Sequence, residues 1–377
     1  MRIANVSVHA LRDPGSAAEH WVSHFKVPHA NEILVQLTTD TGLSGFGLAT
    51  SYTSTEPMVQ ALRTGWLDFV MSADVLAPER LYQRLFALTW DRLSFEKGWT
   101  REALVRLSAA VDIACWDILG KAAGMPLYRL MGGFRATVPY YVTCAYYQTG
   151  KGLPELRDEL QQLRGQGHTR FKAKVGGLTL DEDMERLALI RQTIGWDCEL
   201  MVDVNRAWDL RTATRAVALM EPLKPRWLEE PLRWPDDRHE TTRLAQRTHI
   251  PITGGESEMT SAGCRAFIDE RAISVLQFDV TMMGGFTEGR KLAALCELNH
   301  VDVAPHHDAF IHAHLVAGSP AGLIVESFPD PARDPLQAEL FENPPQMRDG
   351  LLHLREDPGL GLRLSQDAVA KFGTKIV

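Results

Sequence analysis

The sequence has few cysteines and no long apolar run. Five cysteines lie far apart among 377 residues, without a C-x-x-C pair, so we expect reduced thiols and neither a disulfide framework nor a zinc site. No stretch approaches the roughly 18 apolar residues of a membrane span. The first residues, Met1 to Val6, lack the apolar segment of a signal peptide. These absences predict a cytoplasmic protein without a membrane partner.

The sequence also lacks an excess of positive charge. The formal net charge is −8, and basic and acidic residues are interspersed without a basic stripe. Nucleic acid is therefore not an expected partner. Hydrophobic residues make up 45% of the chain, enough for a large core. The length suggests two or three domains, although one barrel can exceed roughly 200 residues.

Residues 1–125 have the pattern of an α+β unit. Alternating and β-branched residues predict strands at 3–11, 33–39 and 43–48. Apolar residues at helical spacing predict helices at 56–69, 78–90 and 101–123. The expected arrangement is a strand meander followed by helices.

A long connection separates the first two predicted strands. It runs from Ser16 to Asn31, and loops of this length are often lids over a binding site. The alternative is an ordinary surface loop. As a lid, this segment would offer a substrate the side chains of His20, Trp21, His24 and Lys26.

From residue 126 to 328, short apolar runs alternate with amphipathic helical windows. The eight runs are 138–144, 171–175, 200–204, 227–230, 251–255, 273–279, 301–305 and 323–328. Eight such repeats favour a closed parallel barrel over the alternative of two open sheets. The window after the seventh run is short. Residues 329–377 are Pro-rich, and we expect their hairpin-like piece at 351–354 and turn at 360–362 to return to the first unit.

The second run contains two lysines. Side chains two positions apart in a strand share a face, so Lys172 and Lys174 point the same way. Neighbouring ammonium groups lower each other's pKa, and a lysine with a lowered pKa can act as a base near neutral pH. The competing interpretation is a solvated edge strand.

Polar residues end the later runs. They are Asp203, Glu229, Glu256, Asp279, His306 and Glu326. In a parallel barrel, active-site residues lie at the C-terminal ends of the strands. Carboxylates from three adjacent strands can bind one Mg²⁺, which prefers oxygen ligands. Each acid taken singly is more simply a helix N-cap, but the ordered series favours a site.

These motifs together resemble the enolase superfamily, and within it the mandelate racemase-like subgroup, over nearly the whole chain. The resemblance implies a modified TIM barrel, (β/α)7β, at 126–328, an α+β capping domain at 1–125, and a segment at 329–377 that returns to the cap. The sixth run, Leu276 to Asp279, has no lysine, unlike the muconate-cycloisomerase and enolase-like subgroups.

The resemblance also implies roles for the motif residues. Mg²⁺ would bind Asp203, Glu229 and Glu256, and the catalytic groups would be Lys172, Lys174, an Asp279–His306 dyad and Glu326. Spacing from Asp279 favours His306 over its neighbour His307. We expect His307 to face a neighbouring pocket or the barrel wall, and include it among substrate-contact candidates.

The activity implied is Mg²⁺-dependent abstraction of the proton α to a carboxylate in a small-molecule substrate. The expected reaction is dehydration of an acid sugar, an aldonate or aldarate, to a 2-keto-3-deoxy acid. Asn205, Arg206 and the polar lid residues suit such a hydroxylated acid. Alternatives are a racemase or epimerase of a 2-hydroxy acid, another lyase or isomerase, and a non-catalytic metal-binding relative. Relatives of this type imply a homo-oligomer, from dimer to octamer.

Overall fold

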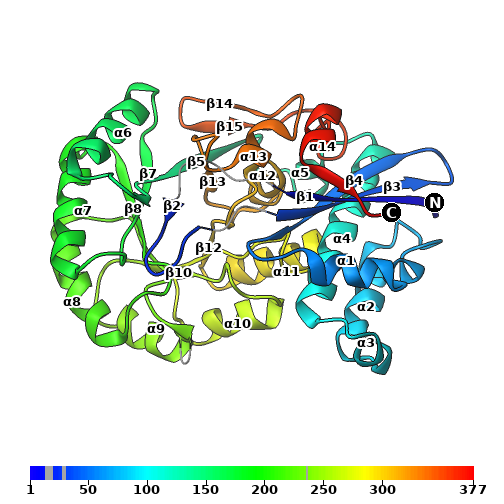
Figure 1. Ribbon diagram of the computed structural model, residues 1–377, viewed down its shortest axis with the longest axis horizontal. Coiled ribbons are helices and arrows are strands. Elements are labelled where there is room, and N and C mark those ends of the chain that lie inside the picture. The colour runs from blue at the N-terminus through cyan, green and yellow to red at the C-terminus, as the bar shows by residue number, and fades with distance from the viewer. Residues whose placement is uncertain (13–19, 28–30, 235–236) are drawn as a thin grey trace.

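The structure is a computed structural model that describes residues 1–12, 20–27, 31–234 and 237–377. Its N-terminal part is an antiparallel sheet in the order β16-β1-β3-β4, packed on helices (Figure 1). The strands are β1 (Ile3–Arg12), β3 (Asn31–Thr39), β4 (Ser44–Ser51) and β16 (Gly373–Lys375). The long helix α4 (Arg101–Ala123) lies close against β4 because Gly47 has no side chain: a Cβ there would lie 2.1 Å from the Ala110 carbonyl oxygen.

Each of the two shorter predicted helices is divided in two, and the remaining cap helices are short. They are α1 (Glu56–Arg63), η1 (Trp66–Phe69), α2 (Pro78–Ala87), η2 (Leu88–Trp90), α3 (Arg92–Lys97) and, next to the barrel, α5 (Leu127–Leu130). The expected helix at 56–69 is interrupted at Gly65, which has a φ of 105°. The sequence did not predict α3, whose N-cap Asp91 accepts a hydrogen bond from the Leu93 N–H. Apart from α5, these helices bury apolar side chains against α4 and the sheet.

The second part is the predicted barrel. Within the described residues its eight strands are β5 (Thr137–Cys144), β7 (Arg170–Lys174), β8 (Glu199–Asp203), β9 (Leu228–Glu229), β10 (Ile252–Gly254), β11 (Val275–Leu276), β12 (Asp302–Val303) and β13 (Val325–Ser327). The helices that alternate with them are α6 (Leu153–Gly165), α7 (Leu180–Ile194), α8 (Leu210–Met220), η3 (Glu221–Leu223), α9 (Asp237–Ala245), α10 (Ser261–Asp269), α11 (Gly285–Leu298) and α12 (Ala309–Gly318). Neighbouring strands from β5 through β12 pair in parallel.

The barrel closes between its first and last strands. β13 pairs in parallel with β5, and a parallel bridge joins Val303 to Gly322 at the β12 side. Bulky side chains fill the interior: Tyr141, Met201, Trp227, Val275, Ala304 and Ile324. The predicted closed barrel is therefore confirmed, and two separate open sheets are excluded.

The C-terminal segment divides between the two parts. The hairpin of β14 (Gln346–Arg348) and β15 (Leu351–His353) pairs with β5 of the barrel, so our expectation that this piece returns to the cap is wrong. The first residues of β5 extend beyond β13 and leave an open edge that β15 covers. After α13 (Pro335–Glu339), which precedes the hairpin, and α14 (Gln366–Phe372), which follows it, β16 pairs with β1 of the cap.

Buried hydrogen bonds join the cap to the barrel. The carboxylate of Asp112 on α4 accepts a hydrogen bond of 2.9 Å from the Thr287 N–H in the first turn of α11, and Trp116 Nε1 donates to Thr287 Oγ1 at 3.0 Å. Asp117, also on α4, accepts from the Leu360 N–H at 2.8 Å. The turn at 360–362 therefore does contact the cap, as expected.

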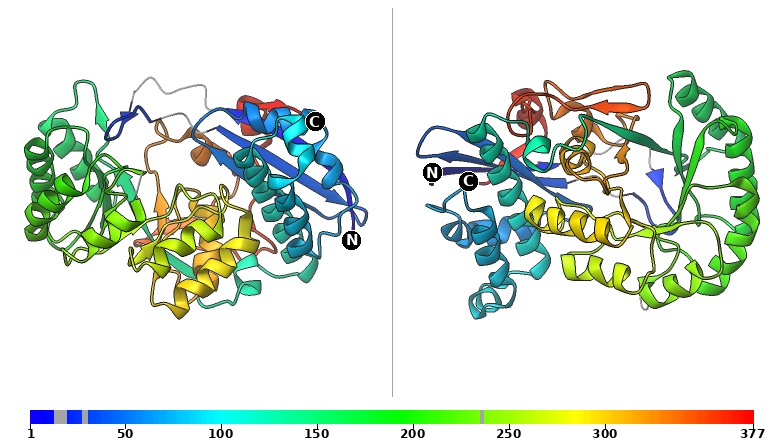
Figure 2. Two further views of the ribbon diagram at one scale, coloured as in Figure 1. Left: turned by 90° about the horizontal axis from the view of Figure 1, so that it is seen from below. Right: turned by 180° about the vertical axis from the view of Figure 1, so that it is seen from behind.

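One short cap element lies on the barrel. β2 (His20–Trp21) pairs with β6 (Tyr147–Gln148), which follows β5 (Figure 2). The five cysteines are buried and free, as predicted. In the described part of the chain, no helix combines the length and apolarity needed to cross a bilayer.

Candidate active site

The two lysines of β7 point into the barrel mouth. Lys172 is 1% exposed, and its Nζ lies 2.6 Å from Glu229 Oε1 and 2.7 Å from Glu326 Oε1. Lys174 Nζ lies 2.5 Å from Asp203 Oδ2. The shared face is as predicted, and the alternative of a solvated edge strand is wrong.

The expected lowering of the lysine pKa values does not occur in this arrangement. Burial lowers the pKa of Lys174 and of Lys172, but the facing carboxylates, led by Asp203 for Lys174 and Glu229 for Lys172, outweigh it and raise both. The expected lowering rested on the neighbouring ammonium group alone and took no account of these carboxylates. Opposite charges in direct contact favour the charged form more than a like charge opposes it.

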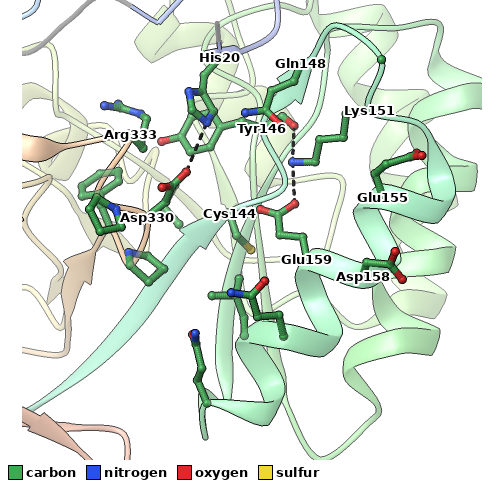
Figure 3. A pocket seen from close by; sticks show the side chains of 18 of the residues that line it. His20, Cys144, Tyr146, Gln148, Lys151, Glu155, Asp158, Glu159, Asp330 and Arg333 are labelled. Atoms are coloured by element: carbon green, nitrogen blue, oxygen red, sulfur yellow. Dashed lines mark hydrogen bonds and ion pairs between the residues drawn. The ribbon is translucent and has the colours of Figure 1, made fainter. Parts of the chain in front are cut away.

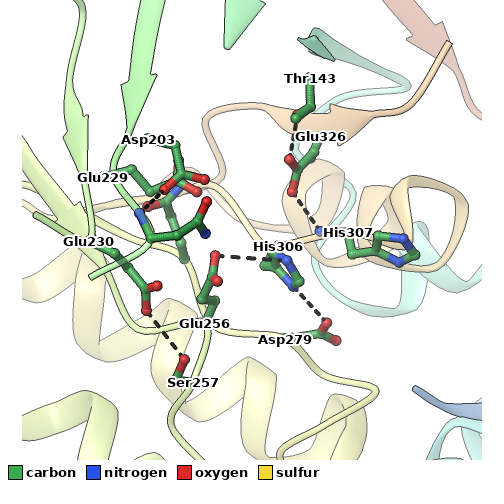
Figure 4. Close-up of polar contacts among 12 residues, drawn as sticks. Thr143, Asp203, Glu229, Glu230, Glu256, Ser257, Asp279, His306, His307 and Glu326 are labelled. Carbon is green, nitrogen blue, oxygen red and sulfur yellow. Dashed lines mark hydrogen bonds and ion pairs between the residues drawn. The ribbon is translucent and has the colours of Figure 1, made fainter. Parts of the chain in front are cut away.

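Three carboxylates follow three consecutive barrel strands. Asp203 ends β8, Glu229 ends β9, and Glu256 comes two residues after β10 (Figure 4). Asp203 and Glu229 are fully buried. Burial, together with the charge of Asp203, raises the pKa of Glu229 to about 8. Trp227 Nε1 and Gln277 Nε2 donate hydrogen bonds to Glu229 Oε2 at 3.1 and 2.7 Å, and these fix its orientation.

The donor chemistry of this cluster fits a hard divalent cation. Among the described residues, no three His, Cys, Asp or Glu side chains are gathered tightly enough to form a ready metal centre, and lysine ammonium groups contact Asp203 and Glu229. Nearby, however, two buried acceptor oxygens have no hydrogen-bond donor, Asn205 Oδ1 and Glu230 Oε2. Carboxylate and amide oxygens in excess over donors are what Mg²⁺ requires of a protein.

Glu230 does not face away from the site. The β9 strand ends at Glu229, and Glu230 has a φ of 39°, so the alternation of a strand no longer applies. Its Oε1 accepts a hydrogen bond from Ser257 at 3.3 Å and lies 3.5 Å from Arg206 Nη1. Glu230 therefore neutralises and positions Arg206 at the barrel mouth.

The predicted dyad is formed. His306 Nδ1 lies 3.2 Å from Asp279 Oδ2, and the other oxygen of Asp279 accepts from the N–H and hydroxyl of Thr281 at 2.8 and 2.7 Å. Burial lowers the pKa of His306, but Glu256, Asp279 and Glu326 together raise it above its usual value. Glu256 Oε2 lies 3.8 Å from His306 Nε2, so the imidazole lies between two carboxylates (Figure 4).

Glu326 lies in the middle of β13 and is held by hydrogen bonds. Its Oε1 accepts a hydrogen bond from Thr143 Oγ1, and its Oε2 accepts one of 2.9 Å from the His307 N–H. Burial raises the pKa of Glu326, but the cations Lys172, His306 and Lys174 outweigh it and lower the pKa. Glu326 is thus a buried carboxylate that stays ionised.

The side chain of His307 points away from the cavity, against our expectation of a substrate contact. His307 has a φ of 56° and is 1% exposed. Its Nε2 lies 2.7 Å from Asp334 Oδ2, and its Nδ1 lies 3.4 Å from Asp308 Oδ2. His307 therefore holds the C-terminal segment to the barrel.

A cavity of about 300 Å³ brings most of these groups together. Its walls include Lys174, Asn205, Arg206, Glu256, His306 and Glu326. Val22, Phe25, Lys26 and Val27 of the predicted lid also line it, whereas the described residues His20, Trp21 and His24 do not. Residues 16–19 and 28–30 of that prediction lie outside the described residues.

The three lid residues that do not line the cavity make contacts outside it. The ring of His20 packs edge-on to Tyr146 at 5.5 Å between centroids, and Trp21 stacks on Tyr147 at 6.1 Å. His24 Nδ1 lies 2.8 Å from Ser23 Oγ. The placement of His20 and Trp21 follows from the pairing of β2 with β6, which turns apolar lid residues toward the cavity.

Sequence reasoning missed several lining residues. They are Tyr52, Thr53, Tyr146, Ser257, Met282, Phe328 and Arg333. Tyr146 and Phe328 each follow a barrel strand directly or within two residues, so the rule used for the acids could have found them. Tyr52 comes from the cap, just after β4, and its ring is edge-on to His306 at 5.5 Å.

Comparison with known proteins gives a clear result. The family model described as "Mandelate racemase / muconate lactonizing enzyme, N-terminal domain" matches residues 6–132, and "Enolase C-terminal domain-like" matches residues 155–368. The chain belongs to the mandelate racemase/muconate lactonizing enzyme family of the enolase superfamily.

Relatives in this family act on sugar acids. The chain is 27% identical to arabinonate dehydratase of Saccharolobus solfataricus, over 92% of both chains. It is 30% identical to 3,6-anhydro-alpha-L-galactonate cycloisomerase of Streptomyces coelicolor, over 80% of both. The crystal structure of L-talarate/galactarate dehydratase from Salmonella typhimurium, liganded with Mg and L-lyxarohydroxamate, superposes with a TM-score of 0.88 at 27% identity, covering 99% of this chain and 93% of that one.

Proposed function

We propose that this enzyme abstracts the proton α to a carboxylate with the aid of Mg²⁺ and dehydrates an acid sugar to a 2-keto-3-deoxy acid. The observation that carries the proposal is that Lys174 and His306, two groups able to transfer protons, line one cavity together with Glu256 and Glu326. The dehydratases among the relatives support the reaction class.

Asp203, Glu229 and Glu256 would hold the magnesium ion. When bound there, Mg²⁺ supplies positive charge that stabilises the substrate carboxylate as the α-proton leaves. The chain's own cations contribute in the same direction. Lys172, buried beside Glu229 and Glu326, adds a fixed positive charge below the cavity.

The proton transfers belong to Lys174 and His306. The one that is in its neutral form removes the α-proton, and the electron pair of the C–H bond enters an enolate that the carboxylate shares. His306 or Lys174 then donates a proton to the β-hydroxyl, the C–O bond breaks, and water leaves. The resulting enol takes a proton at C3 and becomes the 2-keto acid. Asp279 orients the imidazole and stabilises its charged form.

The same geometry favours one alternative. Two proton-transfer groups on one cavity also permit removal of a proton by one residue and its return by the other, which is racemisation or epimerisation of a 2-hydroxy acid. A library of acid sugars incubated with enzyme and Mg²⁺ separates the reactions. Semicarbazide detects a 2-keto acid, and proton NMR in deuterated water detects exchange or inversion at C2. No keto acid and no exchange from any acid would overturn the proposal.

A further inference from the structure

A second and larger cavity shares a wall with the active-site cavity. It measures about 720 Å³ and lies between β5, α6 and the segment that follows β13 (Figure 3). Tyr146, Phe328 and Arg333 line both cavities. The Arg333 guanidinium lies over both aromatic rings, 5.2 Å from each centroid. Arg333 therefore stands at the junction of the two cavities.

Burial lowers the pKa of Arg333, but the charges of Tyr146 and Asp334 and a hydrogen bond with Tyr146 outweigh it and raise the pKa, while part of the guanidinium remains without a partner. In the described ranges, no carboxylate lies within ion-pair distance of its guanidinium, and its buried Nε has no hydrogen-bond acceptor. The two nearest acids in sequence are already engaged, since Asp330 lies 3.6 Å from His20 Nε2 and Asp334 pairs with His307.

Two other cations around the cavities form direct ion pairs. Lys151 Nζ, in the larger cavity, lies 2.6 Å from Glu159 Oε2 and donates to the Tyr146 carbonyl oxygen at 2.9 Å (Figure 3). Arg206, in the active-site cavity, faces Glu230. A half-buried guanidinium with an unsatisfied N–H costs free energy unless an anion binds to it. Arginine suits a carboxylate because its planar fork matches two carboxylate oxygens.

The position of Arg333 relative to the reacting groups tells which carboxylate it would bind. Lys174 Nζ lies 5.6 Å from the centroid of the Tyr146 ring, and Arg333 Cζ lies 5.2 Å from the same centroid. Both cations thus lie close to the same ring. The substrate carboxylate next to the reacting carbon would lie at the end of the cavity where Lys174 and the proposed Mg²⁺ ligands are. The anion that binds Arg333 is therefore a different group of the same substrate molecule.

We propose that Arg333 binds a second, distal carboxylate, and that the substrate is a diacid of the aldarate class. This inference rests on the proposed function and makes its substrate class narrower. The rings of Tyr146 and Phe328 would contact the distal end of the substrate beside Arg333. The larger cavity would lie beyond that end of the substrate.

The test compares acids that differ at one end. A six-carbon aldarate and the aldonate of the same configuration, with CH₂OH in place of the distal carboxylate, are assayed with wild type, Arg333→Gln and Arg333→Lys. We expect wild type to favour the aldarate, and Arg333→Gln to lose about 100-fold in kcat/KM for the aldarate, chiefly through KM. Arg333→Lys should restore part of the loss. Arg363→Gln, an exposed arginine of the same C-terminal segment, is the matched control.

Binding provides a readout separate from turnover. Calorimetry on Lys174→Ala, with and without Arg333→Gln, measures the affinity for each acid in the presence of Mg²⁺. An equal loss of affinity for both acids would show that Arg333 only supports the aromatic side chains of the cavity wall, and would overturn the inference. A wild-type preference for the aldonate would also overturn it. Arg333-dependent aldarate binding without turnover of any acid would instead uphold the inference and overturn the proposed reaction.

Discussion

At the scale of single residues, Glu229 is one of the three carboxylates of the proposed metal site. It is fully buried and contacts Lys172 directly. Glu229→Gln keeps the shape but removes a carboxylate that would bind Mg²⁺, so we expect kcat to fall by about three orders of magnitude. Magnesium affinity by calorimetry should fall with it. Glu199→Gln, at the opposite end of strand β8, is the control, and full activity in excess EDTA would contradict the metal assignment.

The two proton-transfer residues should give separable defects. His306→Asn should abolish turnover yet permit exchange of the α-proton with solvent deuterium if Lys174 removes it. Lys174→Ala should abolish exchange from its own side of the substrate. NMR of recovered acid in deuterated water measures both, and Asp279→Asn should show a weaker version of the His306 defect. Unchanged turnover in both His306→Asn and Lys174→Ala would contradict the assignment.

His307 should behave as a structural residue. His307→Asn leaves Asp334 buried and unpaired, which costs about 3–5 kcal/mol of unfolding free energy. The acids Asp334 and Asp308 outweigh burial and raise the pKa of His307, so its contribution is complete below about pH 6.5 and fades as the pH rises through the raised value. Urea unfolding of wild type and variant at pH 6 and at pH 9 measures this. A larger difference at the higher pH would show that His307 is not held as a cation.

The site residues differ in how predictable they were. Acids at strand ends stand out because a short apolar run must end where the chain turns polar, and a parallel barrel brings those ends together. The lysine pKa values were not predictable, because they depend on carboxylates that lie 29 or more residues away in the sequence. Arg333 was missed because nothing in its neighbouring sequence distinguishes it from an exposed arginine.

At the scale of elements, a short strand pairing determines which side chains of the lid segment face the cavity. Two residue pairs, His20 with Gln148 and Trp21 with Tyr147, fix β2 on the barrel. Because this register joins segments far apart in sequence, the sequence predicted a lid but not which of its side chains face inward. The eight barrel strands were predicted, although β11 proved to be two residues long and Asp279 lies three residues beyond it.

Lys26 is the one predicted lid contact that lines the cavity. Lys26→Gln should change which acids are accepted more than it changes kcat, since the residue lies on the lid and not at the reacting groups. We expect a shift of about 10-fold in the ratio of kcat/KM between acids of a panel. His24→Gln, on the same segment but off the cavity, is the control. Identical profiles for Lys26→Gln and wild type would show that the lid does not select the substrate.

At the scale of the whole molecule, Asp112 joins the cap to the barrel. Burial raises the pKa of Asp112 to about 7, although Thr287 and Phe286 N–H groups and the Thr287 hydroxyl stabilise its charged form. The folded protein therefore binds a proton here more tightly than the unfolded chain, whose aspartate pKa is about 4. The contribution of Asp112 to stability thus decreases as the pH rises from about 4 to 7. Asp112→Asn should flatten that decrease in thermal unfolding followed over the same range, and an unchanged slope would contradict the pKa.

The placement of β16 has a consequence for how the chain is made. β1 leaves the ribosome before the barrel. β16, which covers one end of the outer edge of β1 through His9, Ala10 and Leu11, is made after the entire barrel. Until then that edge presents unpaired backbone groups, a template for pairing with other chains. Strand β1 therefore keeps this part of its edge unpaired until β16 has been made, and we expect pairing between nascent chains to be a risk of this topology.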